Sequence, residues 1–134
     1  MRVLVDTLVW SLALRRARVA PHPAVDELRA LIDEGRVAII GPIRQELLSG
    51  VKTAAAFVQL RDHLQAFADE TLETADFERA AEHFNTCRAR GVQGSNTDFL
   101  LCAAAERRGL PILTTDADFA RFADILPIDL HGRA

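Results

Sequence analysis

The stretch Gly94-Ser95-Asn96-Thr97-Asp98-Phe99-Leu100-Leu101-Cys102-Ala103-Ala104-Ala105 is apolar on almost every face of a helical wheel. A helix of this kind is expected to be buried in the centre of a fold. One carboxylate, Asp98, lies near its start and shares a face with Leu101 and Ala105, which aims the acid inward. Ser95 and Asp98 also have the spacing of a capping box, in which Asp98 only satisfies backbone N–H groups. Both interpretations stay open here, and the number of other acids aimed at the same place decides between them.

The composition is that of one ordinary globular domain, expected to span residues 1–134. Apolar residues make up 49% of the chain and charged residues 26%, which is usual for globular proteins, and the length suits a single core. No apolar run approaches the roughly 20 residues of a membrane helix. Met1 leads directly into the apolar run Arg2-Val3-Leu4-Val5, with no signal-peptide pattern before it. We therefore expect a cytoplasmic protein that makes no contact with a membrane.

Several function classes find no support in the residues present. The four histidines have no HxxxH or HxH spacing, which argues against zinc, and no GxSxG elbow indicates a serine hydrolase. Cys87 and Cys102 are expected to be small buried residues. A net charge of −3 does not indicate a nucleic-acid binder. Nearly all basic residues are arginines, Lys52 being the one lysine; this bias suits phosphate contacts, but genomic base composition explains it equally well.

Short apolar runs alternate with helical stripes along the whole chain. The runs lack polar alternation, which is typical of a parallel sheet covered on both faces. They are residues 2–5, 37–40, 110–114 and, at an edge because of Pro127, 126–130. Residues 70–73 form either a short strand or an extended connector. The fold class is therefore expected to be α/β, with a central parallel sheet of four to five strands flanked by helices.

Two local features of the helices are also predicted. The apolar stripes at 43–50 and 56–67 belong to consecutive helices that lie close enough in sequence to form a helical hairpin. Thr74 is expected to cap the helix that follows, and Gly109 is expected to end the helix that begins near Asn96.

Acidic residues recur where the predicted strands end. Asp6 ends the first strand, and Asp116 and Asp118 directly follow the third. Glu46 lies within the apolar stripe of the helix after the second strand, and Asp98 begins the buried helix. Because ligands bind beyond the carboxyl ends of parallel strands, topology places all five acids around one rim. Each acid alone has a plain structural explanation, as a helix cap or a water-facing side chain, but five coincidences on one rim favour a functional site.

Carboxylates gathered in this way repel one another and raise each other's pKa unless a cation lies between them. Hard divalent ions are bound by oxygen ligands, and Mg²⁺, with Mn²⁺ as the alternative, keeps waters and takes substrate phosphate. One or two such ions can activate a water for phosphodiester hydrolysis. Four polar residues adjoin the acids and are candidates to orient them or the metal-bound waters: Thr7, Asn96, Thr97 and Thr115.

Four motifs occur in the order found in PIN-domain ribonucleases. They are Val5-Asp6-Thr7-Leu8-Val9-Trp10, Arg44-Gln45-Glu46-Leu47-Leu48-Ser49-Gly50, Asn96-Thr97-Asp98-Phe99-Leu100-Leu101-Cys102-Ala103-Ala104-Ala105 and Thr114-Thr115-Asp116-Ala117-Asp118-Phe119. In length and layout the chain resembles the VapC toxins of bacterial toxin–antitoxin pairs, and the resemblance covers essentially the whole chain. One departure is Leu8, where many relatives carry a small hydroxyl residue, so a hydrogen bond at that position is not expected here.

The resemblance implies an Mg²⁺- or Mn²⁺-dependent endoribonuclease. Its acidic cluster maps onto Asp6, Glu46, Asp98 and Asp116, with Asp118 as an auxiliary acid. The resemblance also implies a homodimer and a cognate, VapB-like antitoxin whose C-terminal segment blocks the site. The expected substrate is single-stranded or looped RNA, because a recessed site needs a flexible strand. Candidate residues to hold the RNA backbone, each of which can equally be a solvated helix end, are Arg15, Arg16, Arg44, Arg88 and Arg90.

Other acidic-pocket folds fit less well. A response-regulator receiver needs a lysine near its pocket, and Lys52 lies on a distant segment. A haloacid-dehalogenase phosphatase needs a second acid two residues after Asp6, where Leu8 stands. The alternative that survives is non-enzymatic: an RNA- or antitoxin-binding module whose metal site is structural or degenerate.

Overall fold

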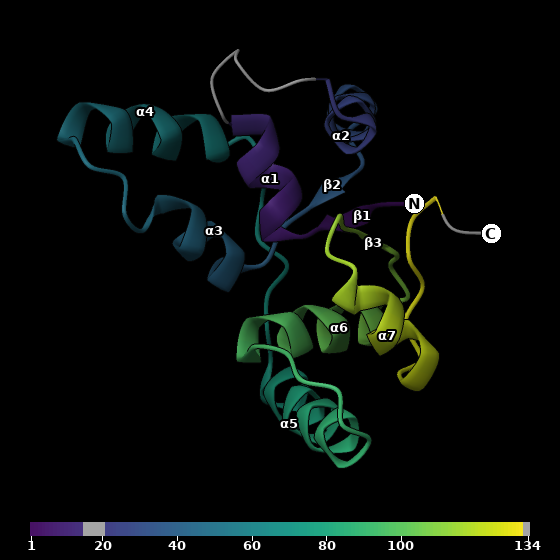
Figure 1. The fold of residues 1–134 in the computed structure, drawn as a ribbon. Helices are drawn as coiled ribbons and strands as arrows, with labels where there is room; N and C mark the ends of the chain where they lie inside the picture. The colour runs from purple at the N-terminus through teal and green to yellow at the C-terminus, as the bar shows by residue number, and fades with distance from the viewer. Residues whose placement is uncertain (15–20, 133–134) are drawn as a thin grey trace.

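The computed structural model describes residues 1–14 and 21–132. Within these ranges a parallel sheet lies between helices (Figure 1). Its strands are β1 (Val3–Val5), β2 (Val37–Ala38) and β3 (Ile112–Leu113), in the order β2-β1-β3. The helices are α1 (Thr7–Leu14), α2 (Pro23–Asp33), α3 (Gly41–Leu48), α4 (Ala54–Leu64), α5 (Thr74–Ala89), α6 (Asn96–Arg108) and α7 (Asp118–Ile125). The expected α/β class with a parallel sheet is confirmed.

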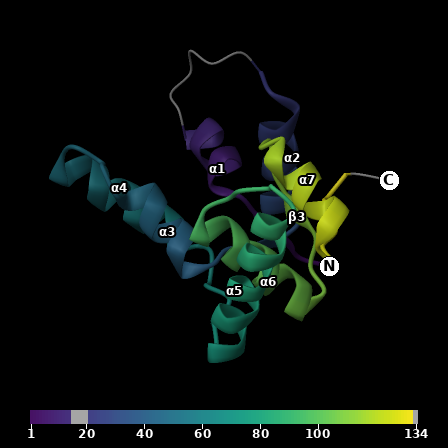
Figure 2. The same cartoon turned by 60° about the horizontal axis from the view of Figure 1, so that its bottom comes forward.

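The helices cover both faces of the sheet. In Figure 1, α1 and α2 lie on one side of the strands, while α5, α6 and α7 lie on the other. All three residues of β1 are completely buried, as expected for a central strand of a parallel sheet. Figure 2 shows α3 and α4 extending together to one side of this three-layer body.

The sheet is smaller than the predicted four to five strands, since the described residues contain three. The expected strand at 126–130 makes a single bridge, between Leu130 and Ile112. Pro127 has no N–H to donate, and the N–H of Ile128 turns back to the carbonyl of Leu126, so no ladder can extend. Residues 70–73, predicted as either a short strand or an extended connector, contain no strand and form the connector; the one bridge beside them joins Asp69 to Ile39.

The buried helix predicted from the opening stretch is α6. Seven consecutive residues, Phe99–Ala105, are buried, which is why the sequence is apolar all round. Gly109 ends the helix in the left-handed conformation, with φ 64°, as a residue without a Cβ can do at low cost. Helix α6 packs mainly against α5 and so connects the sheet to the outer layer.

The start of α5 differs from the expected cap. Glu73, not Thr74, is the N-cap residue, and it forms a capping box with Asp76. The backbone N–H of Glu73 donates to Asp76 Oδ2 at 2.8 Å. Thr74 is the first helical residue. The sequence pattern favoured threonine for its oxygen, but here the Asp76 carboxylate accepts from the N–H of the N-cap residue three positions earlier.

Arg44 joins α3 to the end of α4, and the two consecutive helices contact each other as predicted for a hairpin. Its Nε donates to Asp69 Oδ1 at 2.9 Å and its Nη1 to the Leu64 carbonyl at 2.8 Å. Its Nη2 donates to the Phe67 carbonyl. The three nitrogens of this guanidinium therefore hold the hairpin, and a contact between Arg44 and the RNA backbone would compete with these bonds.

Gly94 lies against aromatic side chains of the core, and we expect Gly94→Ala to destabilise the fold. A Cβ there would lie 2.6 Å from Phe122 Cζ and 3.1 Å from the ring of Phe99, and both rings are buried. Overpacking of this kind costs about 1–3 kcal/mol, measurable by urea unfolding. Gly41→Ala is the matched control, because its Cβ would meet nothing within 4 Å; equal losses in both variants would contradict the prediction.

Both cysteines are buried in the core. Cys87 and Cys102 are free and buried, as predicted, and burial raises the pKa of the Cys102 thiol strongly. In the part of the chain that the structure describes, no helix is both long and apolar enough to cross a membrane.

Candidate metal-dependent active site

Asp6 is the fixed centre of the candidate site. It directly follows β1, and its backbone N–H donates to the carbonyl of Leu113 at 2.9 Å, extending the pairing of β1 with β3. Its Oδ1 accepts from the N–H of Thr7 at 2.8 Å, and its Oδ2 accepts from the hydroxyl of Thr114 at 2.9 Å. The residue is only 5% exposed. Two hydrogen bonds and burial therefore hold this carboxylate in one orientation.

Glu46 reaches the site from α3. The Thr7 hydroxyl donates to Glu46 Oε1 at 2.8 Å, so Thr7 contacts Asp6 through its backbone and Glu46 through its side chain. Glu46 itself is exposed, and it lies at the edge of its apolar stripe rather than inside it. These two hydrogen bonds support the predicted role of Thr7 in orienting the acids.

Asp98 makes the capping box that its spacing suggested. The N–H of Ser95 donates to Asp98 Oδ2, and the N–H of Asp98 donates to the Ser95 hydroxyl, each at 3.0 Å. The half-buried acid also feels the charges of Asp116 and Glu46. Within the described residues no hydrogen bond involves Oδ1. The two interpretations of Asp98 are therefore compatible: one oxygen caps the helix and the other is left for a ligand.

Asp116 and Asp118 lie on the turn that joins β3 to α7. The N–H of Asp116 donates to the Thr114 hydroxyl at 3.0 Å, and the N–H of Asp118 donates to Asp116 Oδ1 at 2.9 Å. Asp116 is half-buried, whereas Asp118 is exposed. Asp118 therefore contacts the site through its backbone, and its carboxylate stays an auxiliary candidate.

The pKa shifts show that these carboxylates share one electrostatic field. Burial, opposed by the hydrogen bonds from Thr114 and Thr7, raises the pKa of Asp6 to about 6, and the charges of Asp98 and Asp116 add to the increase. Burial likewise raises the pKa of Asp98, against the hydrogen bonds from Ser95, and Asp116 and Glu46 raise it further. Like charges near a buried acid disfavour its ionised form.

Within residues 1–14 and 21–132, the site acids differ from Asp76 and Glu106 in having no cationic partner. Asp76 and Glu106 each form ion pairs with arginine. Among the described residues, no ion pair includes Asp6, Asp98 or Asp116, and the same is true of Glu46 and Asp118. Buried carboxylates are normally paired or bind metal, so this donor set has the composition that a hard divalent cation requires.

The acids are not, however, gathered into a finished ligand set. In residues 1–14 and 21–132, no three His, Cys, Asp or Glu side chains already stand close enough together to hold one ion. Asp6 is fixed by its two hydrogen bonds, whereas Glu46 is exposed and has rotamer freedom. An all-oxygen set whose buried member Asp6 is fixed and whose exposed member Glu46 is free to move fits Mg²⁺ or Mn²⁺ if the side chains close on the ion.

Thr114 is the functional residue that the sequence interpretation missed. Thr115 was the predicted orienting residue, but it is exposed and the described structure gives its hydroxyl no partner, while Thr114 bonds to Asp6. The reason is register: Val5 pairs with Leu113, so the next pair is Asp6 with Thr114. Asn96 and Thr97 begin α6, and neither side chain hydrogen-bonds to an acid within the described residues.

Two of the arginines predicted to hold the RNA backbone, Arg88 and Arg90, lie at the C-terminal end of α5. Arg88 lies over the ring of Phe84, 5.5 Å from its centroid, and donates to Asn85 Oδ1 at 3.3 Å. Arg90 caps the C-terminus of α5 and is exposed. Arg15 and Arg16 lie outside the described residues.

A small parallel sheet with an acid after its central strand, and further acids around the same rim, is the arrangement expected of a PIN domain. The PIN domain family model matches residues 3–125, and the chain belongs to this family. It is 32% identical over 127 residues to the VapC ribonuclease Mb1587 of Mycobacterium bovis and to the ribonuclease VapC11 of Mycobacterium tuberculosis, covering 92% of this chain and 92% of each relative. The predicted resemblance to PIN-domain ribonucleases of the VapC type is therefore confirmed.

Solved structures show the same fold at lower sequence identity. VapBC2 from Rickettsia felis, bound to a DNA fragment from its promoter, matches with a TM-score of 0.77 and 18% identity, covering 98% of both chains. FitAcB from Neisseria gonorrhoeae matches with a TM-score of 0.70 and 20% identity, covering 95% of this chain and 96% of that one.

The raised pKa of Asp6 predicts a pH-dependent loss of stability without metal. Well below the usual pKa of 3.8 the group is protonated in the folded and the unfolded protein, so it has no effect. As pH rises from the usual pKa of 3.8 through about 6, the unfolded chain ionises freely while the folded protein resists, and stability falls by up to about 3 kcal/mol. In urea unfolding with a chelator present, the free energy of unfolding of Asp6→Asn should therefore rise relative to that of the wild type between pH 4.5 and 7. A constant difference across that range would contradict the assignment.

Proposed function

We propose that the chain is a metal-dependent endoribonuclease that cleaves RNA phosphodiester bonds and is the toxin of a toxin–antitoxin pair. The observation that carries the proposal is the set of four acids, Asp6, Glu46, Asp98 and Asp116, none of which pairs with an arginine among the described residues. The charges of Asp98 and Asp116 add to the raised pKa of Asp6, those of Asp116 and Glu46 add to the raised pKa of Asp98, and Thr7 bonds to both Asp6 and Glu46. Membership of the PIN family and 32% identity to two proteins named as VapC ribonucleases support it.

In this proposal the four acids hold Mg²⁺ or Mn²⁺, with Asp118 as auxiliary. The ion, when bound, supplies a water of lowered pKa and stabilises charge on the phosphodiester. The chain's own residues do the positioning. Thr114 and the Thr7 N–H fix the two oxygens of Asp6, and the Thr7 hydroxyl directs Glu46 toward the same place. Ser95 restricts Asp98 to one rotamer by taking one of its oxygens.

The partners follow from the same reasoning. The substrate is single-stranded or looped RNA, and Arg88 and Arg90 are candidate contacts to its backbone. An RNA substrate implies a cytoplasmic location. A VapB-like antitoxin and a second copy of the chain are the expected protein partners. The solved structures of similar fold include VapBC complexes from Rickettsia felis and Salmonella typhimurium, which supports the antitoxin.

The direct test incubates the full chain with an RNA that contains both stems and single-stranded loops, in Mg²⁺, in Mn²⁺ and in EDTA. Cleavage in the loops with either metal and intact RNA in EDTA are the expected results. One observation favours a second candidate, a non-catalytic RNA- or antitoxin-binding module: among the described residues, the acids are not preassembled around an ion position. RNA affinity that is unchanged by EDTA, with no cleavage in any buffer, would establish that alternative instead.

A further inference from the structure

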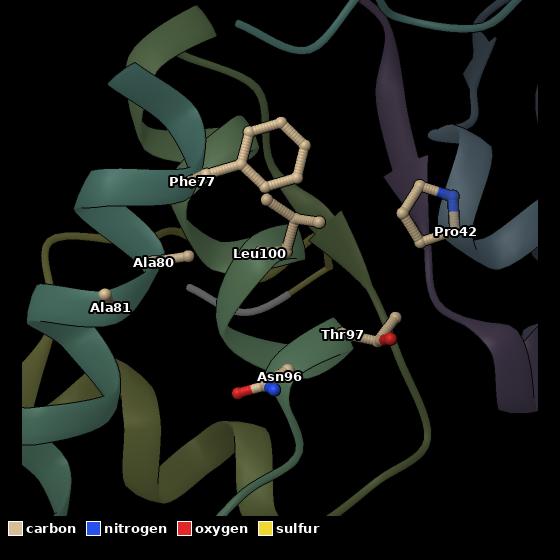
Figure 3. A pocket seen from close by; sticks show the side chains of 7 residues that line it. All are labelled: Pro42, Phe77, Ala80, Ala81, Asn96, Thr97 and Leu100. Carbon is tan, nitrogen blue, oxygen red and sulfur yellow. The ribbon is translucent and has the colours of Figure 1, made fainter. Parts of the chain in front are cut away.

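We propose that the hollow between α3, α5 and α6 is a subsite for one unpaired RNA base next to the bond that is cut; this inference rests on the proposed ribonuclease function. The hollow has a volume of about 390 Å³, within the roughly 300–1,000 Å³ of small-ligand sites. Figure 3 shows the side chains that line it. Neither the predicted acids nor the predicted RNA-binding arginines are among them.

The position of the hollow connects it to the acids. Asn96 and Thr97, at one end, are the first two residues of α6, and Asp98 is the third. Pro42, on the opposite wall, is the second residue of α3, and Glu46 follows it by about one helical turn. Two of the three helices that line the hollow therefore also carry two of the four acids. A base in the hollow belongs to a nucleotide adjacent to the carboxylates.

The surface of the hollow suits the flat face of a base. Phe77 is 53% exposed, more than any other aromatic side chain in the described part of the chain. In Figure 3, Phe77 and Leu100 lie together and point toward the side where Pro42 stands. Unpaired RNA bases stack on exposed aromatic rings, and their edges hydrogen-bond to nearby polar groups. Thr97 supplies a hydroxyl on the Pro42 side, and Asn96 supplies an amide on the α5 side.

Charge favours a base over an anionic occupant. The described residues that line the hollow include no charged side chain, so nothing there would bind a phosphate or an anionic peptide. The neighbouring carboxylates would repel both. A neutral aromatic ring has no such conflict, and the phosphates on either side of it can pass outside the hollow toward the metal site.

The test is a scan of RNA affinity with single bases removed. A fluorescein-labelled 12-nucleotide single-stranded RNA of mixed sequence is compared with copies that lack the base at one position each. Binding is followed by fluorescence anisotropy in Mg²⁺ on an Asp116→Asn background, which keeps the RNA intact. We expect one base removal to weaken binding about tenfold or more, the usual effect of losing a base–aromatic stack.

Variants then locate that stack. Phe77→Ala should lose the same factor on intact RNA and become insensitive to the base removal, Phe77→Trp should restore the wild-type scan, and Ala81→Leu, which narrows the hollow, should behave like Phe77→Ala. Phe57→Ala is the matched control, because Phe57 is an exposed phenylalanine on α4.

Two results would overturn the proposal. One is a parent protein whose RNA affinity falls at no position of the base-removal scan. The other is a Phe77→Ala variant whose affinities match the parent's at every position; if that variant also loses self-association in sedimentation, this face belongs to a second copy of the chain. Failure of the wild type to cleave RNA in the metal assay would contradict the proposed function but leave this binding scan interpretable.

Discussion

Replacing Asp6 by Asn is expected to lower kcat/KM for RNA by about 10³-fold or more, because this residue is the fixed member of the acidic set. A bound metal ion lowers the activation free energy by several kcal/mol, and losing about 4 kcal/mol of that stabilisation slows the reaction by a factor of about 10³. Asparagine keeps the size of the side chain and one acceptor oxygen for Thr114 or Thr7, so the fold should be retained. The loss is therefore attributed to the missing charge.

The same variant should become more stable as it loses activity. Without metal, burial raises the pKa of Asp6 to about 6 and the charges of Asp98 and Asp116 add to the increase, so removing this carboxylate relieves the cost of a buried charge at neutral pH. Mg²⁺ should raise the melting temperature of the wild type, because it binds only the folded site, and should not raise that of Asp6→Asn.

Asp33→Asn, at an exposed position on α2, is the control and should match the wild type in both assays. If Asp6→Asn cleaves RNA at the wild-type rate, or gains stability from Mg²⁺ as the wild type does, the metal site is not at Asp6.

Asp76→Ala is expected to cost about 3–5 kcal/mol of stability with no direct effect on the site. Asp76 is completely buried. Its Oδ1 accepts from Arg107 Nη1 at 2.7 Å and Arg108 Nη1 at 2.8 Å, and its Oδ2 accepts from Arg108 Nη2 at 2.9 Å. The hydrogen bonds from Arg108 hold the pKa of this carboxyl well below its usual range. Removing one partner of a buried ion pair leaves the others uncompensated.

Urea unfolding at pH 7 measures the loss. Asp76→Asn should lose less than Asp76→Ala, because the amide oxygen can still accept from the N–H of Glu73. Asp62→Ala removes the exposed partner of Arg61 and should change stability by less than about 1 kcal/mol. Equal effects of Asp76→Ala and Asp62→Ala would show that the α5–α6 pair contributes no more than a surface contact.

The acids show most clearly what the sequence predicts and what it does not. The sequence predicts Asp98 both as a helix cap and as an inward-aimed acid; its hydrogen bonds with Ser95 show the cap directly, and the contribution of Asp116 and Glu46 to its raised pKa supports the convergence of the acids. Glu46 was expected inside an apolar stripe, yet it is exposed and reaches the site through Thr7. Helical periodicity gives the face of a residue, but it does not give how far a long side chain extends from the edge of that face.

Asp76 shows a different limit. Its partner Arg108 lies 32 residues away, and no spacing rule connects the two. The predicted sheet was too large for a related reason: an apolar run such as 126–130 indicates burial, but whether it forms a ladder depends on the hydrogen-bonding partner that the fold brings beside it. Pro127 was noticed as a sign of an edge, and it ends the pairing after a single bridge.

The amino-acid sequence by itself determined the buried helix α6, the parallel α/β class and the order of acids along the chain, because periodicity, apolar content and strand ends are local properties. Only the tertiary structure decided that Thr114 rather than Thr115 holds Asp6, that Asp76 pairs with Arg107 and Arg108, and that an uncharged hollow lies beside the acids. Those features depend on strand register and on the packing of α5 against α6, and both are set by contacts between residues far apart in the chain.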